Sequence, residues 1–241
     1  MNRFLNNLLR TLLDDWLPPA VRDQRWLMRP LMWLAFGRGA SRYLDFKSAV
    51  LTMRASDLDA VYADVRVSRL LKRQTALNGP SLDRLLIDAA ECARALDVGC
   101  GSGYLAARLA AVADTVVGVD VHLPDGASRR YRSVRFALSR VERLPFPDDS
   151  FDIVVSTHTL EHVKDLEGAV AELRRVSRST VVIVVPRERP FYYSLNLHLH
   201  FFPYAEAFLL RVRPRGAWEC LELGGDLYYV ERFGLTTTET A

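Results

Sequence analysis

The sequence predicts an α/β fold built on a mostly parallel sheet, and three observations support this prediction. Short apolar runs alternate with segments of helical periodicity between residues 81 and 212. A glycine-rich turn, residues 99–103, joins the first apolar run to a helix. Two segments of alternating polarity near the C-terminus, separated by Gly224 and Gly225, are typical of an antiparallel hairpin. We therefore expect parallel strands linked by crossover helices and closed by a hairpin.

Composition and charge exclude several classes of protein. The 241 residues suffice for one domain or one domain with an extension, and 49% hydrophobic with 25% charged residues is typical of a globular protein. The net charge of +3 is spread along the chain, so we expect no nucleic-acid partner. Cys92, Cys100 and Cys220 are odd in number and lack metal-ligand spacing, which indicates a reducing, cytoplasmic compartment and no metal site. No apolar run has transmembrane length, and Asp14 and Asp15 interrupt any signal-peptide core.

The first 80 residues are expected to form a helical extension. Residues 2–17 place leucines on one stripe of a helix and polar residues opposite, and Pro18 ends it. Residues 25–36 are rich in Trp, Met and Leu with interleaved arginines. Two interpretations stay open for residues 1–36: peripheral contact with a membrane surface, or a lid packed on the core.

Two further helices are expected before the glycine turn. Ser56 to Asp59 resembles a capping box that begins a helix towards Leu71. Pro80 and Ser81 begin another helix, whose inner face carries apolar side chains.

The strongest motif begins with the strand at residues 95–98 and continues through Gly99, Gly101 and Gly103 into a helix over residues 104–112. Glycines allow positive φ and carry no Cβ, so a ligand can contact the backbone and the N–H groups at the helix start. The turn therefore predicts a nucleotide site, with Cys100 inside it as a small filler. Counted from Gly101, the same residues also match a dinucleotide pattern, so the glycines alone leave two cofactor classes open.

The second strand, residues 115–120, ends in Asp120. One helix and one strand separate Gly103 from Asp120, so both should lie at the same edge of a parallel sheet. A carboxylate at that edge can accept hydrogen bonds from both hydroxyls of a ribose. Residues 134–138 and 153–156 are expected to form the third and fourth strands.

Three ordered motifs together resemble one family. The pattern D-x-G-x-G-x-G from Asp97 resembles motif I of the class I S-adenosylmethionine (SAM)-dependent methyltransferases. The runs E-x-L-P-F-P-D-x-S-F-D-I-V-V at residues 142–155 and L-E-H-V at 160–163 resemble the ubiquinone and menaquinone C-methylase group, methyltransferase type 11. The resemblance covers about residues 94–186. It implies a three-layer Rossmann-like sandwich with a seven-stranded sheet. The predicted C-terminal hairpin agrees with this fold, whereas a Rossmann dehydrogenase would continue with parallel units.

The resemblance also implies SAM as the cofactor and a role for each matching position. The residues implied to line its methionine part belong to the first motif: Asp97, Gly99, Cys100, Gly101 and Gly103. Asp120 would hold the ribose, with Val121 and His122 beside the adenine. Val141 and Glu142 would flank the adenine on its other side.

Arg140 departs from the family pattern. The family usually has an aspartate there that accepts a hydrogen bond from the adenine amino group, and arginine has no acceptor. Adenine would then depend on backbone groups and packing, or the affinity for SAM would be weak.

The remaining elements are expected at residues 166–178 (helix), 180–185 (buried strand), 203–212 (helix), and 217–223 with 226–231 (hairpin). Residues 191–202 are aromatic and rich in histidine, where this fold usually builds substrate-facing walls. His158 and His162 follow the fourth strand and are the first candidates for a catalytic base, with His198 and His200 as alternatives.

We expect a SAM-dependent methyltransferase that acts on a small or lipid-linked acceptor, with residues 81–235 as the SAM-binding domain and 236–241 as a flexible tail. Two alternatives stay open. The Arg140 departure fits a catalytically inactive binding protein with this fold, and the second glycine count fits an NAD(P)-binding oxidoreductase. Neither the acceptor nor the oligomeric state follows from the sequence.

Overall fold

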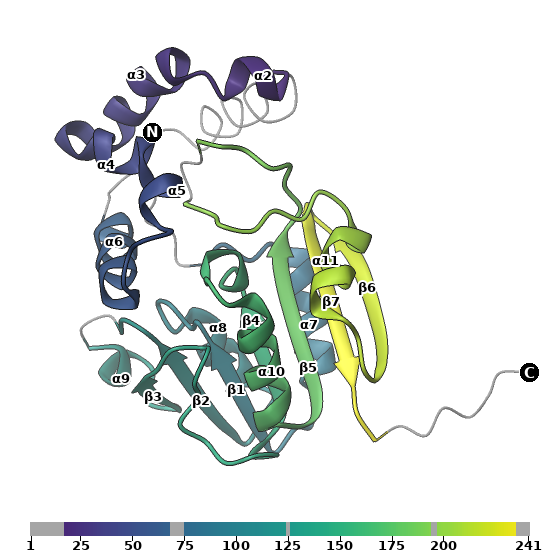
Figure 1. The fold of residues 1–241 in the computed structure, drawn as a ribbon. Coiled ribbons are helices and arrows are strands. Elements are labelled where there is room, and N and C mark those ends of the chain that lie inside the picture. The colour runs from purple at the N-terminus through teal and green to yellow at the C-terminus, as the bar shows by residue number, and fades with distance from the viewer. Residues whose placement is uncertain (1–16, 68–74, 124–125, 194–196, 235–241) are drawn as a thin grey trace, which may run out of the picture. The chain divides into compact units, whose positions relative to one another are not determined.

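The structure is a computed structural model that describes residues 17–67, 75–123, 126–193 and 197–234 (Figure 1). The helix expected over residues 2–17 lies outside these ranges, apart from its last residue. The chain divides into two units, and each is described by itself. The N-terminal unit comprises Met1–Arg73 with Arg189–Leu199, and the sheet unit comprises Gln74–Glu188 with His200–Ala241.

The sheet unit contains one seven-stranded sheet in the order β3-β2-β1-β4-β5-β7-β6. Its strands are β1 (Arg94–Val98), β2 (Thr115–Asp120), β3 (Val134–Leu138), β4 (Phe151–Thr157), β5 (Ser177–Pro186), β6 (Ala217–Leu223) and β7 (Asp226–Arg232). Strands β1 to β5 pair in parallel, whereas β7 is antiparallel to β5 and to β6. The predicted mostly parallel sheet with an antiparallel C-terminal hairpin is confirmed.

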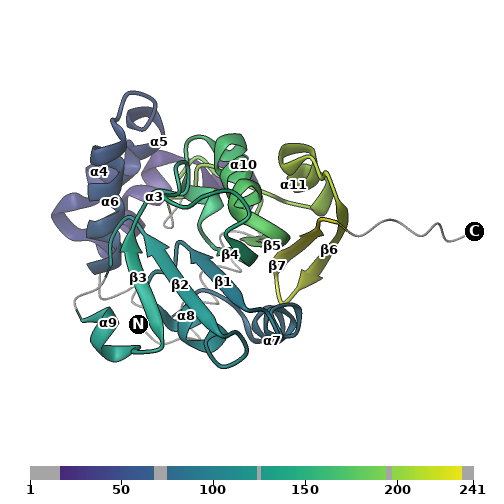
Figure 2. The same ribbon diagram turned by 90° about the horizontal axis from the view of Figure 1, so that it is seen from below.

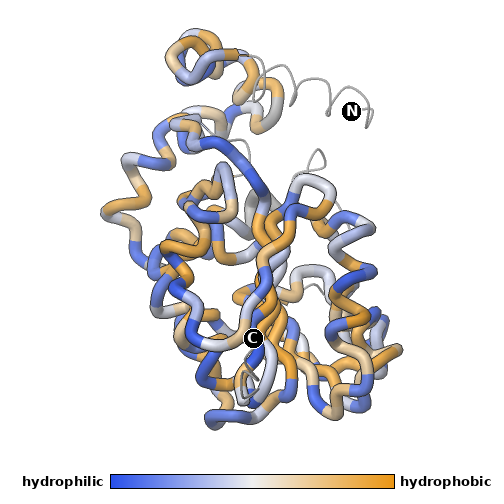
Figure 3. The backbone as a smooth tube through the Cα atoms, turned by 90° about the vertical axis from the view of Figure 1, so that its right-hand side faces the viewer, coloured by the Kyte–Doolittle hydropathy of each residue, from blue (hydrophilic) through white to orange (hydrophobic). Residues whose placement is uncertain are grey.

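Helices cover both faces of this sheet (Figure 2). Alternate strand residues point to opposite faces, so Leu96 packs in a core with α10 (Leu166–Val176) and α11 (Ala205–Val212). Ala95 packs in a second core with α7 (Gly79–Asp88) and α8 (Tyr104–Leu109). The hydrophobic stretches of the strands run between these helices (Figure 3). Burying one Val, Leu or Ile side chain stabilises the fold by about 1.5–3 kcal/mol, so the two cores hold the expected three layers together.

Some boundaries differ from the predicted ones. The helix expected to reach Arg178 ends at Val176, because β5 begins at Ser177 and pairs there with Phe151 across a register shift. The short α9 (Ala127–Arg130) before β3 was not predicted. Such ends depend on pairing with distant residues, which local patterns do not contain.

Two helix starts also differ. Ser56 lies inside α6 (Ala55–Val67) and therefore is not its N-cap, while the Asp57 carboxylate accepts a hydrogen bond of 3.2 Å from the Arg54 N–H. Helix α7 begins at Gly79, and the side chain of Asn78 caps it by accepting a hydrogen bond of 2.9 Å from the Ser81 N–H.

The N-terminal unit consists of short helices around their own core. They are α2 (Pro19–Arg22), α3 (Arg25–Phe36), η2 (Gly37–Gly39), α4 (Ala40–Leu44), α5 (Phe46–Ala49) and α6. The segment Arg189–Leu199 belongs to this unit: the Arg22 guanidinium donates to the Tyr193 carbonyl, and the Lys47 ammonium donates to the Phe191 carbonyl. Within the described part of the chain, every helix is too short or too polar to cross a membrane.

Candidate functional site

The glycine turn adopts the left-handed backbone that its sequence requires. The φ angles of Gly99, Gly101 and Gly103 are +77°, +54° and +79°, a region that residues with a Cβ enter only at a cost. The N–H of Gly99 donates to the carbonyl of Val119 over 2.8 Å, which joins the turn to β2. A Cβ on Gly99 would lie 2.0 Å from the Oγ1 of Thr159, so both the backbone and its neighbour require glycine here.

Asp120 connects the end of β2 to the same turn. Its side chain is buried, its Oδ2 accepts a hydrogen bond of 2.8 Å from the Gly101 N–H, and its Oδ1 accepts one of 3.0 Å from the His122 N–H. A carboxylate can accept about four hydrogen bonds, so this arrangement is compatible with further donors. His122 and Val121 are themselves exposed at the strand end.

Asp97 is the second carboxyl group at this edge. It stands in β1 opposite Gly118 of β2, two residues before Asp120, and only 1% of its surface is exposed. Burial and the neighbouring Asp120 carboxylate raise the pKa of Asp97 to about 7, against the smaller opposing effect of a hydrogen bond from the Ala106 N–H. Its Oδ2 has no hydrogen-bond partner among the described residues, although buried polar atoms in proteins usually have one.

The loop after β3 completes the edge. The Ser139 N–H donates to the Asp120 carbonyl over 3.0 Å, and the buried Val141 packs in the same core as Val119. Arg140 forms an ion pair of 3.3 Å with Glu142. Consecutive strand ends therefore bring Asp97, Asp120 and the Val141 loop together, as a parallel sheet demands.

Comparison with known proteins agrees with this geometry. The protein family described as methyltransferase domain matches residues 96–185. A demethylmenaquinone methyltransferase of Roseiflexus sp. (strain RS-1) is 32% identical over 178 residues, which covers 67% of this chain and 74% of that protein. The chain belongs to the class I SAM-dependent methyltransferases.

Other members of this methyltransferase family match over shorter stretches. A malonyl-[acyl-carrier protein] O-methyltransferase of Geobacter sulfurreducens is 38% identical and matches 51% of this chain but 45% of that protein. An uncharacterized methyltransferase of Bacillus subtilis, YcgJ, is 37% identical, with 38% of this chain and 40% of that protein covered. The chain thus spans less than half the length of several curated relatives. A solved SAM-dependent methyltransferase from Mesorhizobium loti shares the fold at a TM-score of 0.50 and 17% identity, over 64% of this chain and 96% of that one.

The residues of this chain at the strand ends fit SAM, the cofactor of the family. The ribose hydroxyls need acceptors, and the Asp120 carboxylate lies at the end of β2 beside the turn. The sulfonium and the ammonium group of SAM are cationic, and the buried Asp97 has an oxygen that no described residue satisfies. The glycine turn leaves room for a ligand against the backbone.

The imidazole of His158 lies between two carboxylates and is therefore not a free base. Its φ is +49°, its Nε2 lies 3.2 Å from Asp226 Oδ2, and its Nδ1 lies 3.6 Å from Glu161 Oε1. Burial by itself would lower the pKa of His158, but the bonds with Asp226 and Glu161 outweigh it and raise the pKa to about 10. The imidazole therefore keeps its proton at neutral pH and cannot accept another there.

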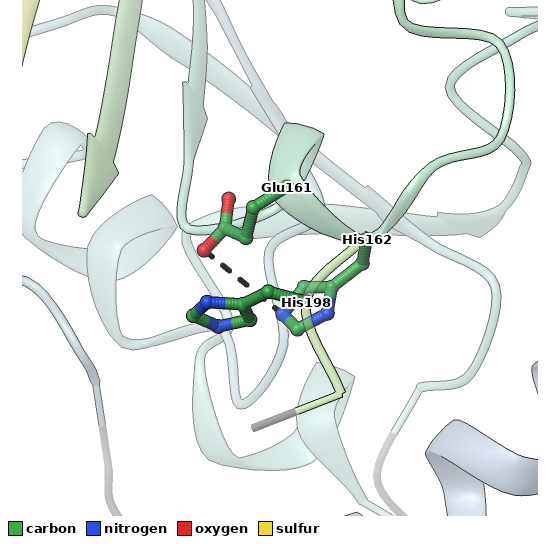
Figure 4. A group of neighbouring side chains, drawn as sticks. All are labelled: Glu161, His162 and His198. Atoms are coloured by element: carbon green, nitrogen blue, oxygen red, sulfur yellow. Dashed lines mark ion pairs between the residues drawn. The ribbon is translucent and has the colours of Figure 1, made fainter. Parts of the chain in front are cut away.

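His162 ends the short helix η3 (Leu160–His162), and its Nε2 lies 3.9 Å from the buried Glu161 carboxylate (Figure 4). The Nε2 of His200 lies 2.9 Å from the Val163 carbonyl, and burial lowers the pKa of this imidazole. His198, which Figure 4 also labels, belongs to the N-terminal unit.

Several residues of the site escaped the sequence patterns. Asn78 donates to Asp226 over 2.7 Å, and Asp226 in turn holds His158. Phe136 and Thr159 fill the space that Cβ atoms on Gly103 and Gly99 would need. The L-E-H-V motif contains Glu161, and it was the one sequence pattern that could have indicated a role for this residue in the site. Asn78 and Asp226 are far from His158 in the sequence, so no local pattern joins them.

Proposed function

We propose that the protein transfers a methyl group from SAM to a small or lipid-linked acceptor. The observation that carries this proposal is the convergence of Asp97, the three positive-φ glycines and Asp120 at one sheet edge. No comparable reason favours an NAD(P)-binding oxidoreductase, because the chain belongs to the methyltransferase family and β7 pairs antiparallel to β5.

We assign the cofactor contacts as follows. The motif I residues would line the methionine part: Asp97, Gly99, Cys100, Gly101 and Gly103. Asp120 would accept hydrogen bonds from the ribose hydroxyls, each contributing about 1.5–3 kcal/mol. Val121 and His122 on one side, and Val141 with Glu142 on the other, would flank the adenine. These contacts follow the order of the strand ends.

SAM supplies a methyl group that its sulfonium already activates. The protein then has mainly to hold the acceptor in line with this group, and good alignment can contribute about 7–11 kcal/mol. Of the two histidines after β4, His162 is the one we propose as a base, because its Nε2 lies 3.9 Å from Glu161, whereas Asp226 and Glu161 hold His158 at 3.2 and 3.6 Å. His158, which keeps its proton, would instead hold Glu161 and Asp226 in place.

The domain roles are part of the same proposal. Residues 81–235 would bind SAM, residues 1–80 would form a lid over the acceptor or a membrane contact, and residues 236–241 would be a flexible tail. The names of the relatives point to different acceptors, among them demethylmenaquinone and malonyl-[acyl-carrier protein]. The first of these relatives aligns over more of the chain, so quinone acceptors are the first to test.

Calorimetric titration tests the cofactor assignment. We expect SAM and S-adenosylhomocysteine to bind, and Asp120→Ala to weaken the binding at least about tenfold through loss of a charged hydrogen bond. Asp114→Ala, an exposed carboxylate just before the other end of the same strand, should bind like the wild type. Equal affinities of the two variants would remove Asp120 from the site, and stabilisation by NAD(P) but not SAM would reverse the choice of cofactor.

One observation favours a second candidate, a binding protein without turnover. Arg140 stands where the resemblance implies an adenine acceptor, and it forms an ion pair with Glu142. Mass spectrometry of metabolite and lipid extracts incubated with protein and SAM separates the two candidates. A gain of one methyl group on any acceptor would exclude the inactive protein, and SAM binding without any methylated product from these extracts would support it.

A further inference from the structure

Helix α3 of the N-terminal unit is apolar on two faces. Met28 and Met32 are fully buried in the core of this unit, with Leu31 and Phe36 packed against that core. The helix therefore already has the apolar stripe that packing requires.

The opposite face of α3 is apolar as well, and it is exposed. Trp26, Trp33 and Leu34 expose 71%, 65% and 66% of their surfaces, and Trp33 and Leu34 follow Trp26 by about two helical turns, which places all three on one side of the helix. Side chains of this size are rarely left in water together without a function. Their exposure therefore indicates a partner.

Arginines stand within and beside this apolar face. Arg29 is exposed between Trp26 and Trp33, and the exposed Arg38 lies in the short helix η2 directly after α3. Among the described residues, no ion pair involves Arg29 or Arg38. We call Trp26, Arg29, Trp33, Leu34 and Arg38 the α3 outer face.

The charge around this face is positive. Residues 17–45 contain five arginines and two aspartates; the aspartates, Asp23 and Asp45, pair with Arg22 and Arg25, so the charge beside the apolar side chains comes from Arg29 and Arg38. Trp side chains prefer the boundary between lipid headgroups and acyl chains, where an arginine can extend to a phosphate while its aliphatic stem stays in apolar surroundings. An in-plane helix with Trp and Leu beside Arg is a recognised pattern of membrane-surface binding.

We propose that the α3 outer face docks on an anionic lipid bilayer surface. A second copy of the chain fits less well, because a two-fold interface would bring Arg29 and Arg38 against their own counterparts or leave them between apolar side chains. A bilayer supplies phosphate charge and apolar volume at the same place and needs no shaped groove to receive a convex helix. The proposal does not depend on the methyl-transfer reaction.

Sedimentation of the full chain with vesicles tests this proposal. We expect binding to phosphatidylcholine vesicles that contain phosphatidylglycerol, little binding to phosphatidylcholine alone, and weaker binding as salt is raised. Arg29→Glu with Arg38→Glu should weaken binding by more than about tenfold, since each arginine near the surface contributes about fivefold. Trp26→Ser with Trp33→Ser should weaken it similarly, and the wild-type Trp emission should shift to the blue on binding.

Matched variants in the sheet unit serve as controls. Trp218 is an exposed tryptophan on β6, and Arg129 and Arg130 are exposed arginines on α9. Trp218→Ser, and Arg129→Glu with Arg130→Glu, should keep wild-type vesicle binding. Titration with SAM on every preparation reports folding and cofactor binding, and so separates failure of this proposal from failure of the proposed function.

Three outcomes would overturn the proposal. The first is absence of binding to anionic vesicles. The second is a loss of vesicle binding in the control variants as large as that in the α3 variants. The third is a concentration-dependent dimer that dissociates in the variant with Trp26→Ser and Trp33→Ser. The last result would assign the α3 outer face to a second copy of the chain.

Discussion

At the scale of single residues, Asp97 lies in an environment unlike that of an ordinary exposed carboxylate. Its pKa of about 7 is above the value of about 3.8 for the unfolded chain, because burial and Asp120 disfavour the charge. Between these values the folded protein binds more protons than the unfolded chain, so the free energy of unfolding falls as pH rises from about 4 to about 7. The loss is complete about one pH unit above 7.

Asp97→Asn should therefore remove this pH dependence. The amide has the same shape and carries no charge, so it removes the repulsion from Asp120. We expect the variant without ligand to be more stable than the wild type at pH 8, by roughly 1–3 kcal/mol, and to differ less at pH 5. Urea unfolding at both pH values measures this, and parallel changes in the two proteins would contradict it.

The stability linked to His158 also falls as pH rises, but over a higher pH range. Its folded pKa of about 10 lies above the unfolded value near 6.5, so its stabilising ion pairs are fully present below pH 6.5 and are lost as pH rises towards 10. His158→Gln should lower the free energy of unfolding at pH 6 by about 3 kcal/mol, as expected when one partner of a buried pair is removed.

The same unfolding experiment across pH 6.5 to 10 checks this mechanism. The wild type should lose stability over that interval, while His158→Gln should change less. Asp226→Asn removes the partner at 3.2 Å and should reduce the slope in the same direction. If the free energy of unfolding of both variants changed with pH as steeply as that of the wild type, His158 would not be the group whose positive charge causes the pH dependence.

At the scale of elements, the cost of adding a side chain to a turn glycine has two parts, backbone strain and crowding by neighbouring atoms. Gly225 in the β6–β7 hairpin has φ of +91° and open space around it, whereas Gly99 has both positive φ and Thr159 in contact. Gly225→Ala should cost about 1–2 kcal/mol from the backbone alone.

Gly99→Ala should cost more than Gly225→Ala, since Thr159 must also move, and it should weaken SAM binding while Gly225→Ala leaves that binding unchanged. Thermal unfolding and calorimetric titration of both variants measure the difference. Equal losses of stability in the two variants would mean that Thr159 can move away from the added Cβ without an energetic cost.

Element identity was predictable from the sequence because each strand–turn–helix unit is local. Residues 134–138 were predicted as the third strand with the bounds that the structure has, and Asn78 was missed as a cap because only the fold shows where α7 begins. The start of β5 was predicted three residues late, since its first residues pair through a register shift with β4.

At the scale of the molecule, the mostly parallel seven-stranded sheet with its C-terminal hairpin and the family were predictable, whereas the surroundings of the site histidines were not. Motif I, Asp120 and the hairpin each follow from a few neighbouring residues. The state of His158 depends on Asp226, 68 residues away, and on Glu161 three residues on. Charge at a buried residue is set by what packs around it, and only the fold supplies that information.

The placement of β7 between β5 and β6 has a consequence for synthesis on the ribosome. Translation delivers β6 before β7, yet β6 has no partner until β7 arrives to separate it from β5. Meanwhile the nascent chain presents the aliphatic residues 181–185 along an uncovered strand edge, a surface to which other chains can adhere. Newly made copies should therefore depend on chaperones most at the moment just before Asp226 leaves the exit tunnel.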